Sequence, residues 1–423
     1  MSGEANITRL AIYDEEGAPT TTAPASNSQF APREVFSISR HVAKTYFLGH
    51  HRAALFELKK ALANIGLVIE CRDSRVPLTS RNRTLDALLG TRDRVIVYTK
   101  ARLAAPPGRT GTGTWGGREM RDQLARWQSA LDTGDAAAHS HGRQPDAVFV
   151  DVDDSRSIAR LVDVLKARAA ASDSILGLRA FIVGLPNAGK SALLNALRVA
   201  GMQKDVKVAR TGVQPGVTRK LSTPIRIVPA TPPPPPSPSP SVTEDSSQQK
   251  QQKRKQELDV GEGVFIVDTP GVFHVTVPDH EVMLKMALVG CVKDWVVPAT
   301  VVADYLLFLL NRHDPALYAH LCAVPTNDVD VFLDAVARRT GRLTKGGLPS
   351  IEGAADWVVK QWRGGALGRF CLDDLSPAAL AAARTAARAK TDASRSIRQA
   401  KRHVKEMRAV VRQARKSARG ESG

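Results

Sequence analysis

The chain has 423 residues, enough for roughly two or three domains, and 43% of them are hydrophobic, so a large core can be buried. Lysine and arginine number 60 against 42 aspartates and glutamates, and the net charge of +18 favours a polyanionic partner, nucleic acid before membrane. The four cysteines have no paired spacing, which argues against a disulfide framework or a zinc site. The apolar run 295–310 contains Pro298 and Asp304 and is too short to span a bilayer.

The chain is predicted to begin with a disordered extension, residues 1–29, which is polar and low in complexity. This extension carries more acidic than basic residues, which does not suit a mitochondrial presequence. Residues 30–48 are richer in arginine and lysine and suit one better. The composition therefore leaves the targeting signal ambiguous.

Helical and strand-like stretches alternate beyond this point. The elements predicted from apolar spacing are a helix over 51–65, strands over 67–69 and 94–98, a helix over 118–131, a strand over 147–150 and a helix over 158–170. Residues 105–117 are rich in glycine, threonine and proline, and we predict a flexible insertion there.

The stretch from Gly184 to Ser191 fits the phosphate-binding loop pattern, a glycine, four residues and then Gly-Lys-Ser. A predicted strand over 179–183 precedes it and a predicted helix over 192–200 follows, as the motif requires. The backbone amides of such a loop surround a polyphosphate, while Lys190 would reach the β- and γ-phosphates and Ser191 would hold Mg²⁺. The alternative is a chance glycine-rich turn, which the later motifs disfavour. The residues predicted to bind the nucleotide here are Asn187, Ala188, Gly189, Lys190, Ser191 and Ala192.

A second phosphate-handling element, Asp268 to Gly271, follows a predicted strand over 264–267. It fits the Asp-x-x-Gly motif of GTPases, in which the carboxylate holds Mg²⁺ through water and the Gly271 amide would meet the γ-phosphate. Thr218 is the predicted switch threonine, whose hydroxyl would also reach Mg²⁺, and the alternative is an ordinary surface threonine. Val272 stands where many GTPases place a water-orienting glutamine, so another group must do that work or hydrolysis is slow.

The segment 229–260, which follows a predicted strand over 225–228, contains five consecutive prolines and a polar run. Prolines cannot donate to a strand ladder, so we predict a disordered insertion between two strands. From residue 280 the strand pattern stops and apolar helical segments continue to about residue 373. Alternating strands and helices predict an α/β domain with a mostly parallel sheet, helices on both faces and ligands at the carboxyl ends of the strands.

The order of the motifs indicates how the strands are connected. A guanine-reading motif, Asn-Lys-x-Asp, normally follows Asp-x-x-Gly, but nothing after Gly271 resembles it. Its only counterpart lies upstream, where Thr99 and Lys100 are predicted to bind the base and Arg102 replaces the usual aspartate. Arginine has only donors and cannot supply that acceptor. We therefore predict a circularly permuted P-loop GTPase domain, with the base-reading strands before the phosphate-binding strands.

Together these motifs resemble the circularly permuted ribosome-assembly GTPases, most closely the mitochondrial ribosome-associated GTPase of fungi and its bacterial large-subunit counterpart. The resemblance spans roughly residues 30–373, apart from the two insertions. The segments that carry it are 47–51 (Phe-Leu-Gly-His-His), 73–82, 184–191, 215–218, 268–271 and the pair Gly346 and Gly347.

The resemblance implies a GTPase domain over residues 30–290, a small all-α domain over 291–373 that binds RNA or the ribosome, and a basic helical tail over 374–423. It implies GTP or GDP as ligand, Mg²⁺ as cofactor, and a K⁺ beside the phosphates that Asn187 helps to hold. It places His50 near the γ-phosphate as the catalytic group in place of the missing glutamine, and a helix-capping or core histidine is the alternative. The implied partners are the mitochondrial large ribosomal subunit and its rRNA. The implied location is the mitochondrial matrix, with peripheral association with the inner membrane left open.

Two functions remain open from the sequence. The first is a slow GTPase that the assembling mitochondrial large subunit accelerates, with hydrolysis driving maturation or release. The second is a non-enzymatic RNA-binding assembly platform with a degenerate nucleotide site, which Arg102 and Val272 keep open. The residues from Ser376 onward include thirteen lysines and arginines against three acids, so the tail is predicted to bind RNA phosphates; a solvated helix is the alternative.

Overall fold

A computed structural model describes the chain over residues 9–11, 30–38, 49–90, 92–104, 118–132, 146–172, 174, 176–202, 221–230, 260–272, 277 and 279–385. The chain divides into two compact units. One consists of residues 1–7, 119–137 and 374–423, and the other of residues 8–118 and 138–373. The predicted boundary between residues 290 and 291 does not separate these units.

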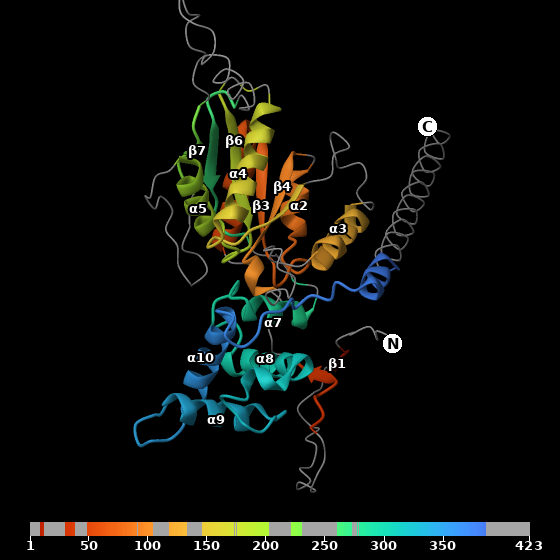
Figure 1. Cartoon of the computed structure of the whole chain (residues 1–423), viewed down its shortest axis with the longest axis vertical. Helices are drawn as coiled ribbons and strands as arrows, with labels where there is room; N and C mark the ends of the chain where they lie inside the picture. The colour runs from red at the N-terminus through yellow and green to blue at the C-terminus, as the bar shows by residue number, and fades with distance from the viewer. Residues whose placement is uncertain are drawn as a thin grey trace, which may run out of the picture. The chain divides into compact units, whose positions relative to one another are not determined.

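A six-stranded sheet forms the centre of the larger unit, in the order β5-β4-β3-β6-β8-β7 (Figure 1). Neighbouring strands are parallel except for the edge strand β7, which is antiparallel to β8. The strands of the sheet are β3 (Leu67–Asp73), β4 (Arg94–Thr99), β5 (Asp146–Phe149), β6 (Leu178–Gly184), β7 (Ile225–Val228) and β8 (Val264–Asp268). The predicted mostly parallel sheet is confirmed, and three of its strands precede the strand that enters the phosphate loop.

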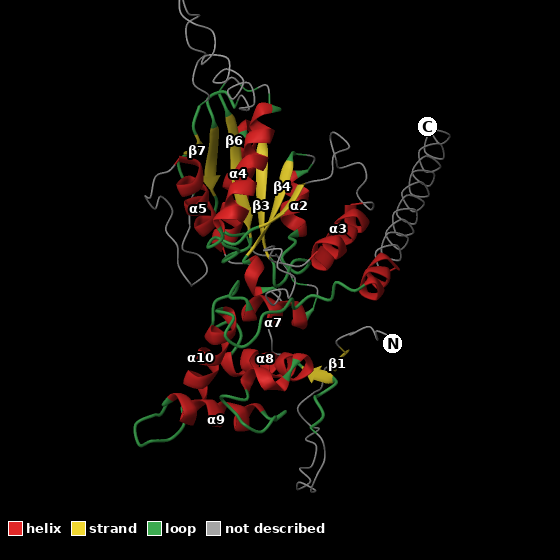
Figure 2. Cartoon of the chain, viewed as in Figure 1, coloured by secondary structure: helices red, strands yellow, loops and turns green. Residues whose placement is uncertain are grey.

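Helices cover both faces of this sheet, as Figure 2 shows. Successive residues of a strand point to opposite faces. Ile69 of β3 belongs to the core that includes α4 and α5, whereas Val68 packs on the opposite face with residues of α1 and α2. The covering helices are α1 (Gly49–Ala61), continued by a 3₁₀ turn (Leu62–Asn64), α2 (Arg83–Leu89), α4 (Ser155–Ala170) and α5 (Lys190–Met202).

Two differences from the predicted elements arise from polar side chains. β3 extends to Asp73, four residues beyond the predicted strand, because Glu70 and Arg72 form a buried ion pair of 2.7 Å instead of ending the strand. α2 was not predicted at all. Its first turn is capped by Asn82, whose Oδ1 accepts from the amides of Thr84 and Leu85.

Helices alone form the second part of the larger unit. They are α7 (His280–Leu288), α8 (Ala299–His313), the 3₁₀ turn Pro315–Tyr318, α9 (Val329–Thr340) and α10 (Ile351–Arg363). α7 begins before residue 291, since the Asp279 carboxylate caps it by accepting from the amide of Val282. In this region the pair Gly346 and Gly347 both have positive φ, 103° and 79°, in the turn before α10.

The segment before the sheet packs against the helical region. Phe36 of β2 (Val35–Ser37) lies edge-on to Tyr305 of α8, with ring centroids 5.2 Å apart, and Arg33 pairs with Asp304 at 2.5 Å. β2 also pairs in parallel with β1 (Arg9–Ala11). Residues 9–11 of the predicted disordered extension 1–29 thus form a strand that pairs with β2.

The smaller unit contains α3 (Arg118–Asp132) and a helical segment over 377–385. Trp127 of α3 is 6% exposed and donates from Nε1 to the carbonyl of Leu375 at 3.2 Å. This contact joins the start of the predicted tail to α3. The predicted insertion 105–117, nearly all of 229–260 and the tail beyond residue 385 lie outside the described residues.

Candidate nucleotide-binding site

The phosphate loop joins β6 to α5 in a backbone conformation that its glycines permit. Gly184 has φ of +146°, and a Cβ there would lie 2.3 Å from the carbonyl oxygen of Cys71 on the neighbouring strand. Gly189 has φ of +82°, and Asn187 is left-handed at φ 55°. A side chain at Gly184 would push β3 and β6 apart, so glycine is required there.

Lys190 begins α5 and is buried, at 6% exposure, beneath the loop. Its Nζ donates to the carbonyls of Leu185 and Gly184 at 2.8 and 3.3 Å. Burial lowers the pKa of this ammonium, and the nearby carboxylate of Asp268 opposes that effect. These two carbonyls fix the Lys190 side chain against the loop, a contact that the motif alone did not predict.

Ser191 and Asp268 bring two oxygens together from different motifs. The Ser191 hydroxyl donates to Asp268 Oδ2 at 2.7 Å, and Asp268 is 2% exposed. The following Thr269 donates from Oγ1 to the carbonyl of Ile182 at 2.7 Å, which fixes the end of β8 beside β6. Two of the three predicted metal ligands therefore lie side by side at the carboxyl ends of these strands.

Gly271 packs directly on the phosphate loop. A Cβ at Gly271 would lie 2.6 Å from Cα of Pro186, so only glycine fits. The next residue, Val272, donates its amide to the carbonyl of Gly184 and accepts at its own carbonyl from Asn82 Nδ2, at 3.2 and 3.0 Å. Asn82 therefore both caps α2 and holds the Asp-x-x-Gly element, a role that sequence reasoning missed.

The predicted base-reading residues also contact the loop. Thr99 donates from Oγ1 to the carbonyl of Ala188 at 2.8 Å. Lys100, left-handed at φ 56°, donates from Nζ to the carbonyl of Asn187 and to Asp73 Oδ2, both at 2.8 Å. These contacts place the end of β4 against the phosphate loop, as the permuted arrangement predicts.

Asp73 is the central buried anion of this region. It is 1% exposed and accepts from the amide, Nε and Nη2 of Arg75 as well as from Lys100. Burial acts to raise its pKa, but Arg75 and Lys100 outweigh burial and hold the pKa well below its ordinary value. Arg75 in turn lies over the ring of Trp362 on α10, 5.2 Å from its centroid.

Arg102, in place of the usual acidic residue, has acidic neighbours. It lies in the 3₁₀ turn Ala101–Leu103, and its Nη2 pairs with Asp153 Oδ2 at 2.6 Å. Its amide donates to Asp151 Oδ2 at 3.4 Å, and its Nε is 3.5 Å from the same oxygen. Both aspartates belong to the loop that follows β5, so negative charge is present at this edge of the sheet.

The side chains of two predicted site residues fall outside what the structure describes. Thr218 lies outside the described residues, and His50 is described only through its backbone, at the start of α1. The described residues contain no group of three histidine, cysteine or acidic side chains arranged to hold a metal. Nor do they include a helix with the length and apolar character needed to traverse a bilayer.

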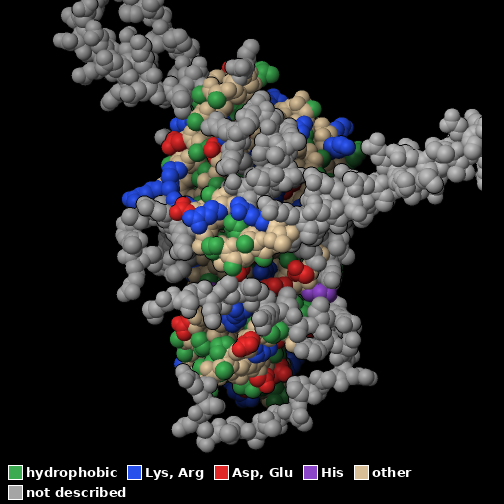
Figure 3. Space-filling view, turned by 90° about the vertical axis from the view of Figure 1, so that its right-hand side faces the viewer, with side chains coloured by type: hydrophobic (Ala, Val, Ile, Leu, Met, Phe, Trp, Pro, Cys, Tyr) green, Lys and Arg blue, Asp and Glu red, His purple; other side chains and the backbone are tan. Residues whose placement is uncertain are grey.

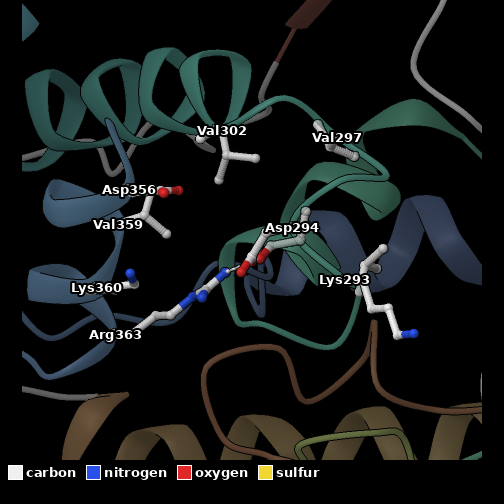
Figure 4. Close-up of a pocket in the computed structure, with 11 residues that line it drawn as sticks. Lys293, Asp294, Val297, Val302, Asp356, Val359, Lys360 and Arg363 are labelled. Atoms are coloured by element: carbon white, nitrogen blue, oxygen red, sulfur yellow. Dashed lines mark hydrogen bonds and ion pairs between the residues drawn. The ribbon is translucent and has the colours of Figure 1, made fainter. Parts of the chain in front are cut away.

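A separate hollow lies among the helices beyond α7 (Figure 4). Arg363 of α10 and Asp294 face each other in it, with Nη2 and Oδ1 3.5 Å apart. Val297, Val302 and Val359 supply apolar walls. No residue of the phosphate loop lines this hollow, so it is distinct from the nucleotide site.

The chain is similar to known GTPases. Residues 179–324 match the family model described as 50S ribosome-binding GTPase. Mitochondrial GTPase 1 of Schizosaccharomyces pombe is 32% identical over 353 residues, 82% of this chain and 94% of that protein. Mitochondrial ribosome-associated GTPase 1 of Xenopus tropicalis is 25% identical, covering 81% and 98%. Ribosome biogenesis GTPase A of Priestia megaterium is 27% identical, covering 79% and 97%. With its permuted sheet, its phosphate loop and its Asp-x-x-Gly element, the chain belongs to the mitochondrial GTPase 1 family and is a GTPase.

Proposed function

We propose that this chain hydrolyses GTP while bound to the assembling mitochondrial large ribosomal subunit, and that hydrolysis drives maturation or release. The observation that carries the proposal is the 2.7 Å contact between the Ser191 hydroxyl and the Asp268 carboxylate beside the phosphate loop. That contact joins the two elements that a GTPase needs for a magnesium-bound triphosphate. The names of the relatives supply the mitochondrial and ribosomal context.

The phosphates would be bound by the loop and the start of α5. The amides of Lys190, Ser191 and Ala192 belong to the first turn of a helix, where amides have no intrahelical acceptor and attract anions. Lys190 would move its donors from the loop carbonyls to the β- and γ-phosphates. The amides of Ala188 and Gly189 would line the loop, and that of Gly271 would face the γ-phosphate.

The oxygen ligands that the structure brings together, from Ser191 and Asp268, suit Mg²⁺. A hydroxyl and a carboxylate oxygen are hard ligands of the kind that Mg²⁺ prefers, and Mg²⁺ retains waters to complete its shell. Ser191 and Asp268 would hold the ion, with Thr218 as a third ligand in the triphosphate state. When bound, the ion would neutralise charge on the β- and γ-phosphate oxygens.

Thr99, Lys100 and Asn187 would complete the nucleotide site. The methylene stem of Lys100 would cover the base, while Thr99 keeps β4 against the loop through its bond to Ala188. For K⁺ beside the phosphates, Asn187 would offer its amide oxygen, since its Nδ2 donates to the carbonyl of Gly290 at 2.7 Å. His50 would orient or deprotonate the attacking water, because the Val272 side chain cannot.

The remaining parts of the proposal concern the partner and the location. On the face that Figure 3 draws, the described residues present basic side chains in several groups with acidic side chains among them. The strongest excess of positive charge in the sequence lies in the tail over 376–423. We assign the helical region 291–373 to contact with rRNA, the tail to its phosphates, and the protein to the mitochondrial matrix with peripheral contact to the inner membrane.

The decisive experiment measures hydrolysis of GTP and ATP side by side, with and without purified mitochondrial large subunits. We expect turnover of GTP to be slow alone and to rise with subunits, whereas ATP turnover stays at background. Hydrolysis of neither nucleotide, with or without subunits, would contradict the enzymatic role.

A further inference from the structure

The base-reading edge of this site has an arginine where a carboxylate is expected. Guanine presents two neighbouring donors, the N1–H and the 2-amino group, and a carboxylate accepts both. Arg102 occupies the position of that carboxylate and has donors only. A chain that binds guanine at this edge must therefore take its acceptor from another residue.

The loop after β5 is the neighbour that can supply one. Tyr98 of β4 pairs in register with Phe149 of β5, and the Ala101 amide donates to the carbonyl of Val150 at 3.3 Å. Because of this pairing, Arg102 lies next to the loop that contains Asp151 and Asp153. Two aspartates are thus available within reach of the arginine.

We propose that the guanine acceptor has moved from the β4 loop to the β5 loop, where Asp153 reads the base and Arg102 positions Asp153. Arg102 Nη2 holds Asp153 Oδ2 at 2.6 Å. The Asp153 side chain is 59% exposed, so a ligand can reach it. This inference rests on the proposed nucleotide site and adds the residue that would select its base.

Asp151 does not fit the same role. Its side chain is 4% exposed. Its Oδ1 accepts from the amide of Asp153 at 3.2 Å, and its Oδ2 accepts from the amide of Arg102 at 3.4 Å. Asp151 therefore shapes the loop, while Asp153 presents a carboxylate outward from it.

The hydrogen-bonding capacity of Asp153 is sufficient for guanine. A carboxylate has about four acceptor positions, and the contact with Arg102 uses one of them. Asp153 also lies next to the predicted base-reading residues, since its partner Arg102 follows Thr99 and Lys100 at the end of β4. The exposed ion pair with Arg102 contributes little to stability, so variants at Asp153 are expected to fold.

The test compares the affinities of the full chain for GDP and XDP by equilibrium binding. Xanthine carries an oxygen in place of the 2-amino group, so an asparagine, which donates as well as accepts, suits it better than a carboxylate. In Asp153→Asn we expect the preference for GDP over XDP to fall on the order of 100-fold, since two charge-assisted hydrogen bonds no longer form. Asp163→Asn, the same change on the exposed face of α4, should leave the preference unchanged.

A charge exchange tests the role of Arg102. Asp153→Arg alone should abolish the preference for GDP, because no acceptor remains at the base edge. Combining it with Arg102→Asp returns a carboxylate to the β4 loop and should restore the preference to within about tenfold of the parent. Restoration of the preference for GDP over XDP would support the proposal, because an ion pair with a purely structural role would not change which base is preferred.

Two results would overturn the inference. If the parent binds GDP and Asp153→Asn keeps its full preference over XDP, Asp153 does not read the base, and the proposed GTPase function stands without it. If the folded parent, checked by circular dichroism, binds neither GDP nor XDP, the proposed function fails and this inference fails with it.

Discussion

Asn187 of the phosphate loop donates a hydrogen bond from Nδ2 to the carbonyl oxygen of Gly290, 2.7 Å away in the segment after α7. Arg363 of α10 donates in turn to the carbonyls of Ala287 and Leu288 at the end of α7. The loop that would bind phosphates is thus joined to the last helix of the helical region through the end of α7. A ligand that binds the side-chain amide of Asn187 would alter this hydrogen-bonded connection.

Asn187→Asp should weaken the connection while keeping the shape and the left-handed conformation of the residue, which aspartate tolerates. The change removes the Nδ2 donor, and we expect the free energy of unfolding without nucleotide to fall by about 1–2 kcal/mol. Urea denaturation measures this decrease. Asn64→Asp, at an exposed position after α1, is the matched control. Equal decreases in unfolding free energy in the two variants would show that the hydrogen bond to Gly290 does not stabilise the fold.

Asp73→Asn should destabilise the chain in a manner that depends on pH. Asp73 has a lowered pKa in the folded state, so its charge adds stability above the ordinary aspartate pKa, and this stability is lost as pH falls toward the folded pKa. At pH 7 we expect a loss of about 3–5 kcal/mol, because Arg75 keeps a buried charge without its partner. From about pH 4 downward the difference from the parent should shrink. A difference that is the same at pH 3 and pH 7, by urea denaturation, would contradict this assignment.

Gly271→Ala should separate the Asp-x-x-Gly element from the phosphate loop. The new methyl group would lie 2.6 Å from Pro186 Cα, and backbone atoms cannot move aside as a flexible side chain can. We expect a cost of about 1–3 kcal/mol in unfolding free energy together with weaker triphosphate binding. Gly364→Ala is the control, since its methyl group would meet atoms only at an ordinary 3.5 Å. Unchanged GTP affinity in Gly271→Ala would show that the two elements need not touch.

The helices and strands that depend on the local spacing of apolar residues could be predicted from the sequence. The strand before the phosphate loop and the helix after it were predicted to within two residues at each end, because apolar periodicity reports burial directly. The contacts of Lys100 with Asp73, and of Asn82 with Val272, were not predictable, because each joins side chains from separate elements. The ion pair of Arg102 with Asp153 is of the same kind, since only the pairing of β4 with β5 brings them together.

His50→Ala should lower subunit-stimulated GTP hydrolysis by roughly 10²–10⁴-fold, the usual contribution of a group that orients or deprotonates the attacking water. The physical reason is the Val272 side chain, which cannot perform that task. GDP affinity should stay within about twofold of the parent, since the role concerns the reaction and not binding. His51→Ala, one residue further along α1, is the control. Parent-like turnover in His50→Ala would assign the chemistry to another residue.

Removal of the tail beyond residue 385 should reduce RNA binding through charge alone. Residues 386–423 carry twelve lysines and arginines, three acids and no phenylalanine, tyrosine or tryptophan, so ion pairing with phosphates is available and stacking on aromatic rings is not. Truncation after residue 385 keeps the helical segment 377–385 and the bond from Trp127 to Leu375. The slope of log affinity against log salt should become shallower by roughly 0.7–0.9 for each phosphate that the tail no longer neutralises, for any RNA sequence.

A full-length variant with Lys401, Arg402, Lys405 and Arg408 changed to glutamine separates charge from length. Because it keeps the whole tail but removes four positive charges, it should show part of the same decrease in salt dependence on mitochondrial large-subunit RNA and on an unrelated RNA alike. A solvated tail that does not touch RNA predicts instead that both the truncated and the substituted proteins keep the salt slope of the parent. That result would assign the RNA affinity to the part of the chain before residue 386, where the helical region lies.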